Sequence, residues 1–471
     1  MLGASIVLSV FGGCSGHGDS EGSSTDDSDT PTETMGTVTK NGISVWLDST
    51  VKSMVWVQWD QKSESVAHVE YSFDDGVWLS SPTEPAPSGI NQRVLVGIPF
   101  DTLVDIRLVT DDVGTVEGPD ARTGANPRFD DRDLPRADLR TGDETSWYES
   151  GHYLITSIND HDGGWRDGTY YTIVLDRQGR TVWAKAAPDK HWTLYVTIDP
   201  ITRDHFLWDE STKWSSLDEG EGSKIHRAYL DREIESIATV GLHHEWVELP
   251  DGTLAWGSVS SDHSTTEALV ELPPGATEAT PIWTCGGSWP GVSHCESNGL
   301  FYEPSTNHYL YSFYTNNSLV ELDRGTGETV WWAGAVNGGY AFVPESSQFA
   351  WQHGVSYTAA GTLLLSTKSA VSGSDITTYV REYEVDRAGE KLNQVWACDS
   401  EEYASTNGDA WRLPNGNTLH IIGAAGQIKE YLPDCTVVWH LDFGNDYLLG
   451  RGEFVDDLYS LVSPIGKGMA P

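Results

Sequence analysis

The stretch FAWQHGVSYTAAGTLLLS, from Phe349 to Ser366, decides the fold. In it a single histidine, His353, precedes a turn, and the turn leads into an apolar run typical of a strand. The same order of segments occurs in HHEWVELPDGTLAWGS, residues 243–258, and in DAWRLPNGNTLHIIG, residues 409–423. Turn residues such as Pro, Gly and Asn reverse the chain between strands. The recurrence predicts a repeated β unit that places one side chain at an equivalent point of each copy.

A second recurring element fixes the length of the repeat. It is an Asp-Arg turn followed by a short strand that ends in tryptophan, as in DRGTGETVW, and it predicts a hairpin between the last two strands of each unit. Complete and shortened versions, one of them without its tryptophan, occur at residues 176–183, 231–240, 281–283, 323–331, 386–396 and 433–439. These positions correspond to six repeats of roughly 50 residues, the period of a β-propeller blade. We expect most of these tryptophans to be structural.

The chain before these repeats predicts a smaller β domain. Strand-like runs with alternating apolar residues occur at a spacing of roughly 12 residues, at 42–48, 53–60, 66–73, 92–99 and 103–110. This pattern resembles fibronectin type III and immunoglobulin-like modules. The sequence therefore predicts an all-β protein, in which a small β-sandwich (38–125) and a linker (126–144) precede a six-bladed β-propeller (145–471).

The N-terminus, MLGASIVLSVFGGCSGHGDS, predicts export. A short apolar run ends in small residues before Cys14, which resembles the lipobox of bacterial lipoproteins, in which the cysteine is lipidated. We expect residues 1–14 to be a lipoprotein signal and the Ser/Thr/Asp/Glu-rich residues 15–37 to be a disordered acidic tether. The apolar run is too short to span a bilayer as a helix. The expected location is the periplasm, the outer membrane or the cell surface, with a lipid anchor as the only membrane contact.

The charge balance excludes two classes of partner. The chain has 29 Lys and Arg against 70 Asp and Glu, a formal net charge of −41. Such a field repels nucleic acid and anionic lipid surfaces, so we expect neither as a partner. An anionic ligand would need a local pocket of cations or hydrogen-bond donors.

Four cysteines remain after the leader, and an even number in an exported chain predicts disulfides. We favour the pairs Cys285–Cys295, which closes a short loop, and Cys398–Cys435, which joins neighbouring repeats. Three connectivities are open to four cysteines. A zinc site is the alternative, but no CxxC pair is present. The Asp-rich residues 158–168 could hold calcium, and we expect them to form a turn instead.

The repeats resemble the bacterial arylsulfate sulfotransferases that use no nucleotide sulfate donor. The resemblance covers residues 145–465 and is carried by HHEWVELPDGTL, FAWQHGVSYTAAGTLLL, WRLPNGNTLHIIG, GRGEFVDDLYS and the run from SNGLFYEP to ETVWWAG. It implies a six-bladed propeller that moves a sulfuryl group from a phenolic sulfate ester to a phenol, with no cofactor. By motif position it implies that His353 is the nucleophile, carrying the group as a sulfohistidine, and that His244 supports it as a donor or acid/base.

The sequence departs from the family pattern around Asn298. The family has a histidine two residues before this asparagine, where this chain has Glu296, and an arginine in the next strand, where it has Tyr314. A carboxylate in place of a cation repels a sulfate. We expect compensation from His294, which lies two residues before Glu296, or from a cation elsewhere in the chain. The candidate cations are Arg412 and Arg451.

Two other functions remain open. The first is a non-catalytic, surface-anchored propeller that binds a neutral or cationic small molecule or a glycan by aromatic stacking, which Glu296 and the acidic balance favour. The second is a quinoprotein-like dehydrogenase, because DRGTGETVWW resembles the blade motif of those propellers. Six repeats, where such enzymes usually have eight, argue against it. A cation that converges on His353 would favour sulfuryl transfer over binding alone.

Overall fold

The computed structural model describes residues 36–74, 76–130, 132–160, 169–212, 220–259, 267–289, 291–369 and 375–468. The chain divides into two compact units, Met1–Gly36 and Thr37–Pro471, and everything below concerns the second. The expected signal with Cys14, most of the expected tether and the possible calcium residues 161–168 lie outside the described residues. No described helix is long and apolar enough to cross a membrane.

The regular structure of the described residues is almost entirely β. The helices have three or four residues each: α1 (Cys285–Ser288), α2 (Pro464–Lys467) and the 3₁₀ helices η2 (Glu345–Ser347), η3 (Gly423–Ala425) and η4 (Leu458–Leu461). The strands form eight sheets. The fold class predicted from alternating apolar runs is confirmed at this level.

Two sheets occupy residues 38–122. One has the strand order β1-β2-β3-β7 and the other β10-β8-β4-β5, with β6 paired to β4 and β9 to β8. Their strands are β1 (Val38–Lys40), β2 (Ile43–Leu47), β3 (Val55–Gln61), β4 (Ser65–Ser72), β5 (Trp78–Ser80), β6 (Glu84–Ala86), β7 (Gly89–Leu95), β8 (Leu103–Thr110), β9 (Gly114–Glu117) and β10 (Ala121–Arg122). The five predicted runs correspond to β2, β3, β4, β7 and β8. In β3 burial alternates along the strand, as a sheet with one core-facing side requires.

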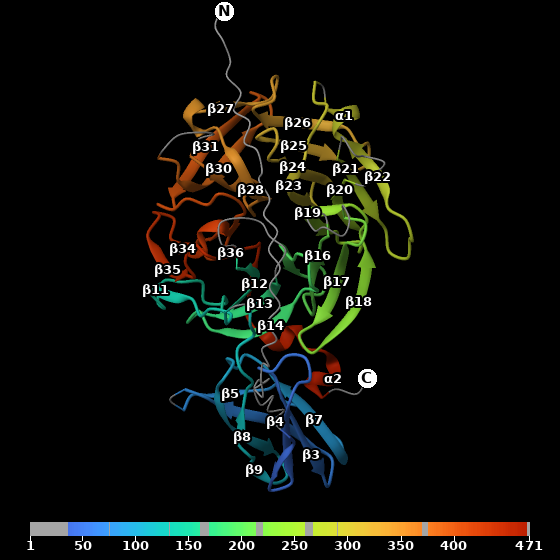
Figure 1. Cartoon of the computed structure of the whole chain (residues 1–471), viewed down its shortest axis with the longest axis vertical. Helices are drawn as coiled ribbons and strands as arrows, with labels where there is room; N and C mark the ends of the chain where they lie inside the picture. Colours follow the sequence, from blue (N-terminus) through green and yellow to red (C-terminus); the bar gives the residue numbers. More distant parts are fainter. Residues whose placement is uncertain are drawn as a thin grey trace, which may run out of the picture. The chain divides into compact units, whose positions relative to one another are not determined.

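From residue 138 on, sheets of four or five mostly antiparallel strands follow one another, and Figure 1 shows them around a common centre, the arrangement of a β-propeller. The strands of the first three of these sheets are β12 (Tyr153–Asn159), β13 (Tyr170–Asp176), β14 (Thr181–Ala186), β15 (Val196–Ile198), β16 (Phe206–Glu210), β17 (Lys224–Tyr229), β18 (Arg232–Ala238), β19 (Leu242–Glu248), β20 (Leu254–Ser258), β21 (Ala268–Leu272) and β22 (Thr280–Thr284). The sheets that follow contain β23 (Ser297–Glu303), β24 (His308–Phe313), β25 (Ser318–Asp323), β26 (Thr329–Gly334), β27 (Ala341–Val343), β28 (Ala350–Tyr357), β29 (Leu363–Lys368), β30 (Thr378–Asp386), β31 (Lys391–Asp399), β32 (Asp409–Arg412), β33 (Thr418–Ile422), β34 (Gln427–Tyr431) and β35 (Val437–Asp442).

Both ends of this region contribute strands that close the ring. The strand β11 (Asp138–Gly142) pairs with β35, and β36 (Leu448–Leu449) and β37 (Glu453–Val455) pair with β12. The sequence analysis assigned residues 126–144 to a linker, and β11 corrects that assignment in part. Pairing with β11 covers the edge of β35, which would otherwise present unpaired backbone groups.

The Asp-Arg turns form the predicted hairpins between the last two strands of their sheets, for example β13–β14 and β25–β26. Their arginines bind a glutamate in the third strand of the preceding sheet. Arg177 donates to Glu430 at 2.8 Å, Arg324 to Glu271 at 2.8 Å, and Arg387 to Glu321 at 2.8 Å. In three of the sheets the recurring motif therefore ties the sheet to the one before it.

The tryptophans and cysteines also connect sheets. Trp183 donates to the carbonyl of Leu230, and Trp439 to the carbonyl of Arg177, each at 2.9 Å. The two disulfides are Cys285–Cys295 and Cys398–Cys435, the pairing that the sequence favoured. The second joins β31 to the turn between β34 and β35 in the neighbouring sheet.

Candidate functional site

A small cavity lies where the first strands of successive sheets meet. It is lined by Leu194, His244, Glu245, Asn298, His353, Asn407, Gly408 and Arg451. These residues lie at the beginning of β19, β23 and β28 or just before β15, β32 and β37. The structure thus brings together four side chains that the sequence singled out, namely His244, Asn298, His353 and Arg451.

His353 presents a neutral ring to the cavity. Its Nδ1 lies 2.9 Å from the carbonyl oxygen of Trp351, which can only accept, so Nδ1 carries the proton. Burial, together with the charges of Lys368 and Arg451, lowers the pKa of His353 to about 4, although the hydrogen bond to the Trp351 carbonyl acts in the opposite direction. The Nε2 of His353 therefore keeps its lone pair at neutral pH, as a nucleophile requires.

A glycine allows the close approach of the strand that carries His353. Gly354 has a φ of +57°, and a Cβ at this position would lie 2.5 Å from Oδ1 and 2.6 Å from Cα of Asp409. Any side chain here would push β28 away from β32. The glycine thus holds His353 against the strand whose first residue, Asp409, anchors Arg451.

Arg451 is compensated by two carboxylates. Its Nη1 lies 2.5 Å from Oε2 of Glu245, its Nε lies 3.1 Å from Oδ1 of Asp409, and its guanidinium stacks over Tyr195 at 4.3 Å. Burial raises the pKa of Glu245 and of Asp409, and Arg451 counteracts this in both cases. With two acidic partners, Arg451 supplies little positive charge for an anionic ligand.

Lys368 supplies the charge that Arg451 lacks. It lines a second small cavity together with Trp351, His353, Ser366, Thr367, Thr378, Ala404, Thr406 and Asn407, so His353 borders both cavities. The residue is 9% exposed, and its Nζ donates to the carbonyl of Ser405 at 2.9 Å. In the described part of the chain no carboxylate lies within ion-pair distance of Nζ, and burial lowers the pKa of this lysine. A buried ammonium without a counter-ion is costly, and such groups occur at sites that bind anions.

Sequence reasoning missed Lys368. The signal was present in LLLSTK, a fully buried strand that ends in a charged residue. A terminal lysine on an apolar strand is ordinarily a solvated end, so the pattern alone did not separate Lys368 from other lysines.

His244 is held from behind by its neighbour. Nδ1 of His244 lies 2.7 Å from Nδ1 of His243, and Nε2 of His243 lies 2.8 Å from Oε2 of Glu267. His244 itself has a positive φ of 64°, which turns its side chain away from the regular path of β19. The pairing of adjacent histidines was not predicted.

Asn298 has a structural role, because both groups of its side-chain amide are hydrogen-bonded to the protein. Its amide donates to the carbonyl of Gln352 at 2.7 Å, and its carbonyl oxygen accepts from Ser312 at 2.9 Å. These bonds tie β23 to β28 beside His353.

The other predicted residues lie around the cavity or away from it. Tyr314 donates a hydrogen bond to Glu296, and its ring lies 5.8 Å from the ring of His244 and 6.5 Å from that of Trp351. His294 is exposed on the preceding loop. Arg412 lies at the far end of β32, where it pairs with Glu382 at 2.5 Å. Arg412 and His294 line neither cavity, so neither compensates for Glu296 there.

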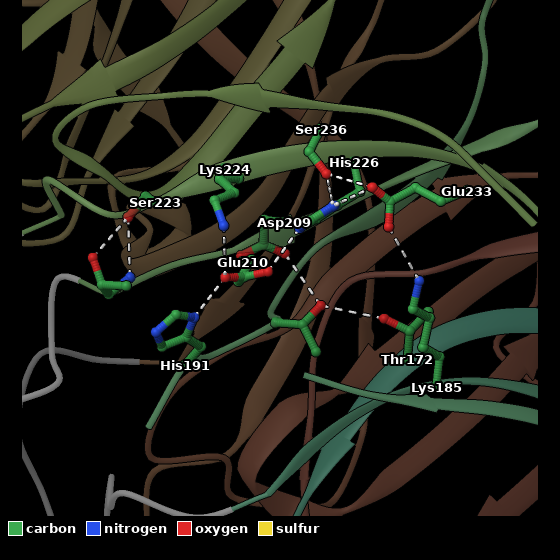
Figure 2. Close-up of polar contacts among 12 residues, drawn as sticks. Thr172, Lys185, His191, Asp209, Glu210, Ser223, Lys224, His226, Glu233 and Ser236 are labelled. Carbon is green, nitrogen blue, oxygen red and sulfur yellow. Dashed lines mark hydrogen bonds and ion pairs between the residues drawn. The ribbon is translucent and has the colours of Figure 1, made fainter. Parts of the chain in front are cut away.

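Figure 2 shows how lysine and histidine side chains are paired elsewhere in the same ring. Glu210 accepts from His191 at 2.6 Å and from His226 at 2.8 Å, and Lys224 lies 3.6 Å away. Burial would raise the pKa of Glu210, but the hydrogen bonds of His226 and His191 lower it to about 2. Every cation of this network faces a carboxylate, in contrast to Lys368.

Both cavities at His353 are narrow, each with a volume of about 10 Å³, so a ligand larger than water requires side chains to move. A cavity of about 910 Å³ lies elsewhere, bordered by Tyr71 and Trp147 among others. Its two arginines are already paired, Arg177 with Glu430 and Arg180 with Asp74 and Asp176. We assign the site to the small cavities because they combine the neutral imidazole of His353 with a cation, Lys368, that has no acidic partner among the described residues.

One group of described residues has the spacing of a metal site. Asp199, Asp204 and His205 could together offer three ligand atoms to a cation. Thr202 already donates hydrogen bonds to Asp199 and Asp204. None of the three borders the cavities at His353, so a cation there would take no part in the chemistry of that site.

Comparison with known proteins adds little to this geometry. No protein-family model matches the chain, and no curated protein matches it. Among solved structures it is similar to a protein of unknown function from Bacteroides caccae (14% identity, TM-score 0.41, 62% of this chain and 93% of that one). It is also similar to the periplasmic gluconolactonase PpgL of Pseudomonas aeruginosa (12%, 0.39, 83% and 99%) and to the Cps50 (Swd1) β-propeller domain of Myceliophteria thermophila (11%, 0.35, 67% and 89%).

Proposed function

We propose that the sheets from β12 to β35 are the six blades of a propeller and that the two sheets of residues 38–122 form a β-sandwich. The region holds six sheets, and the residues that line the cavity lie in or next to a strand of each of them, which supports the blade count. The alternating burial along β3 and β8 supports the sandwich.

We propose further that the protein transfers a sulfuryl group from a phenolic sulfate ester to a phenol. Nε2 of His353 attacks sulfur, the N–S bond forms as the S–O bond to the aryl oxygen breaks, and that oxygen takes a proton from an acid. A second phenol then attacks the same sulfur, the N–S bond breaks, and the phenol proton passes to a base. His244 borders the same cavity and is placed for both proton transfers.

The ammonium of Lys368 is the observation that carries this proposal. Three negatively polarised oxygens surround sulfur throughout the transfer, and a fixed cation in a water-poor site stabilises them strongly. Lys368 borders the cavity of His353 without an acidic partner among the described residues. Lys368 supplies the cation that the family pattern places at the position of Tyr314. Its charge offsets the repulsion between Glu296 and a sulfate.

The test is a mass measurement on the intact full chain mixed with 4-nitrophenyl sulfate. We expect a gain of one sulfuryl group that is absent in His353→Ala and discharged by added phenol. Lys368→Met should slow adduct formation at least about 100-fold, the effect of removing one group that stabilises the transition state. Lys429→Met is the matched control, since Lys429 is equally buried and also donates to a carbonyl, but lies near Glu402 and outside both cavities. No adduct and no release of nitrophenol would refute the proposal.

Binding without catalysis is the second candidate, and the pair formed by Tyr314 and Glu296 favours it. The ring of Tyr314 stacks on Trp351, and Glu296 places a carboxylate beside this aromatic surface. A flat cation or a sugar would suit such a surface. Calorimetry with a quaternary ammonium or an oligosaccharide, and a loss of heat in Trp351→Ala, would establish this function if no adduct forms.

We also propose that the protein is exported and anchored by lipid on Cys14. Two disulfides support an oxidising compartment. Metabolic labelling with a fatty acid, lost in Cys14→Ser, tests the anchor.

A further inference from the structure

Three side chains form a continuous hydrogen-bonded chain behind the cavity. His243 is fully buried and joins Glu267 through Nε2 and His244 through Nδ1. Glu267 is fixed in turn by the backbone N–H of Ser297 at 2.7 Å and by the hydroxyl of Tyr311. His244 is the member of this chain that borders the cavity.

The hydrogen bonds determine where the protons lie. An ionised carboxylate can only accept, so Nε2 of His243 donates to Glu267. A neutral His243 then has its lone pair on Nδ1, and this nitrogen accepts the Nδ1 proton of His244. The neutral His244 tautomer therefore carries its lone pair on Nε2, and in this state it can act as a base.

The same chain holds a second arrangement. When Nε2 of His244 takes up a proton, the proton between the two Nδ1 atoms can pass to His243. His243 then becomes an imidazolium that donates to Glu267 and to His244, while His244 is neutral and carries its proton on Nε2. The positive charge thus rests against Glu267, away from the cationic side of the cavity.

From this geometry we propose that Glu267 and His243 are positioning residues that switch His244 between base and acid. The inference rests on the proposed sulfuryl transfer. In the first half-reaction the charged pair gives the Nε2 proton of His244 to the departing aryl oxygen. In the second, the neutral pair takes the proton of the incoming phenol, so the pair is unchanged after one turnover.

The packing around Glu267 agrees with a fixed relay. A Cβ at Gly257 would clash with Oε1 of Glu267 and with the hydroxyl of Tyr311. Only glycine leaves room for these groups to approach β20. Moving the carboxylate away from His243 would break its hydrogen bonds with Ser297 and Tyr311.

The first test needs no activity. Nitrogen-15 labelling of histidine in the full chain, with His243→Gln and His244→Gln for assignment, reports which ring nitrogens carry protons. We expect Nδ1 of His244 to be protonated at neutral pH, and the pair to take up one further proton on acidification. Glu267→Gln should lower the pH of that uptake by about 1 to 3 pH units, because the neighbouring negative charge is lost. Uptake at the same pH in the variant would overturn the relay.

The second test separates proton transfer from mere structure. Phenyl sulfate has a poor leaving group that needs a proton, whereas 4-nitrophenyl sulfate does not. Glu267→Gln should slow turnover of phenyl sulfate by about 100-fold or more and that of 4-nitrophenyl sulfate by much less. Glu271→Gln is the matched control, since Glu271 lies in β21 of the same sheet, accepts from Tyr309 at 2.6 Å and from Arg324 at 2.8 Å, and contacts no histidine among the described residues.

The outcomes are distinguishable. Equal losses on both esters in Glu267→Gln would assign Glu267 a structural role and overturn the inference. A wild-type protein that turns over neither ester would end the proposed sulfuryl transfer, and the histidine titration would still decide whether the chain holds and moves a proton.

Discussion

Replacing Lys368 by methionine should make the protein more stable and at the same time inactive. Lys368 is 9% exposed, and among the described residues it has only a carbonyl partner. Methionine has a similar shape and fills the same space without a charge. The folded state would no longer bear the cost of a desolvated ammonium, whereas the unfolded state would lose nothing comparable.

The size of the effect follows from the cost of an uncompensated buried charge. Exchanging buried charged groups for apolar ones of similar volume stabilises proteins by about 1–4 kcal/mol in favourable cases. We expect the lower part of this range, about 1–2 kcal/mol, because the ammonium keeps one hydrogen bond and lies over Trp351 at 4.9 Å and Tyr403 at 5.2 Å, which offset part of the cost.

The stability difference between the wild type and Lys368→Met should depend on pH, in a direction set by the pKa of Lys368. Burial lowers the pKa of Lys368 in the folded state, so between the folded value and the unfolded value of about 10.4 the unfolded chain binds more protons. The wild type therefore gains stability as pH rises through this window. The advantage of Lys368→Met should be largest at neutral pH and should shrink toward pH 10.

Denaturant unfolding at several pH values measures the difference. The same experiment with added sulfate should stabilise the wild type more than Lys368→Met, because only the wild type offers an anion site at His353. A variant that is less stable than the wild type at neutral pH, or that gains as much from sulfate, would refute the assignment of Lys368 as an uncompensated anion-binding cation.

Three further predictions concern the same ring. Arg177→Met should destabilise the protein by about 3–5 kcal/mol in denaturant unfolding, because it leaves a fully buried carboxylate without its partner. Gly354→Ala should reduce adduct formation because its methyl group displaces Asp409, whereas Gly361→Ala, with a similar positive φ but nothing within 4 Å, should bear only the backbone cost and keep its activity. With 4-nitrophenyl sulfate, whose leaving group needs no proton, the rate of adduct formation should be independent of pH above about 5 and fall below about 4, where His353 takes up a proton; a midpoint near 6.5 would contradict the burial argument.

Local chemistry made much of the fold predictable. The Asp-Arg turn with its valine-tryptophan strand identified the outer hairpins, because the tight turn and the alternating run that follows it lie within about ten residues of the sequence. The closing strand β11 was not predictable in this way. Its partner β35 lies some 300 residues further along the chain, and residues 138–142 are exposed and polar enough to resemble a linker.

In the candidate site, too, some residues were predictable from the local sequence and others were not. His353 and His244 were found from motif positions and Arg451 was named as one candidate for a compensating cation, and the three meet at one cavity. Lys368 and Glu267 were missed because their importance depends on neighbours in space. For Lys368 it is the lack of a nearby carboxylate among the described residues, and for Glu267 it is the histidine that its carboxylate holds. Neither relation can be found in one sequence.

The cationic side chains of the framework differ from the one at the candidate site in whether they have a carboxylate partner. The arginines of the Asp-Arg turns and Arg451 all have glutamate or aspartate partners. These ion pairs neutralise their charges and stabilise the packing of the sheets and of the cavity wall. Among the described residues, Arg93 and Arg381 are also buried without an ion pair, but a guanidinium is weakly hydrated, and each bonds to backbone carbonyls and stacks on an aromatic ring. Lys368 is a strongly hydrated ammonium, and it borders the cavity of a neutral histidine. Its burial is therefore best explained by an anion that occupies the site during function.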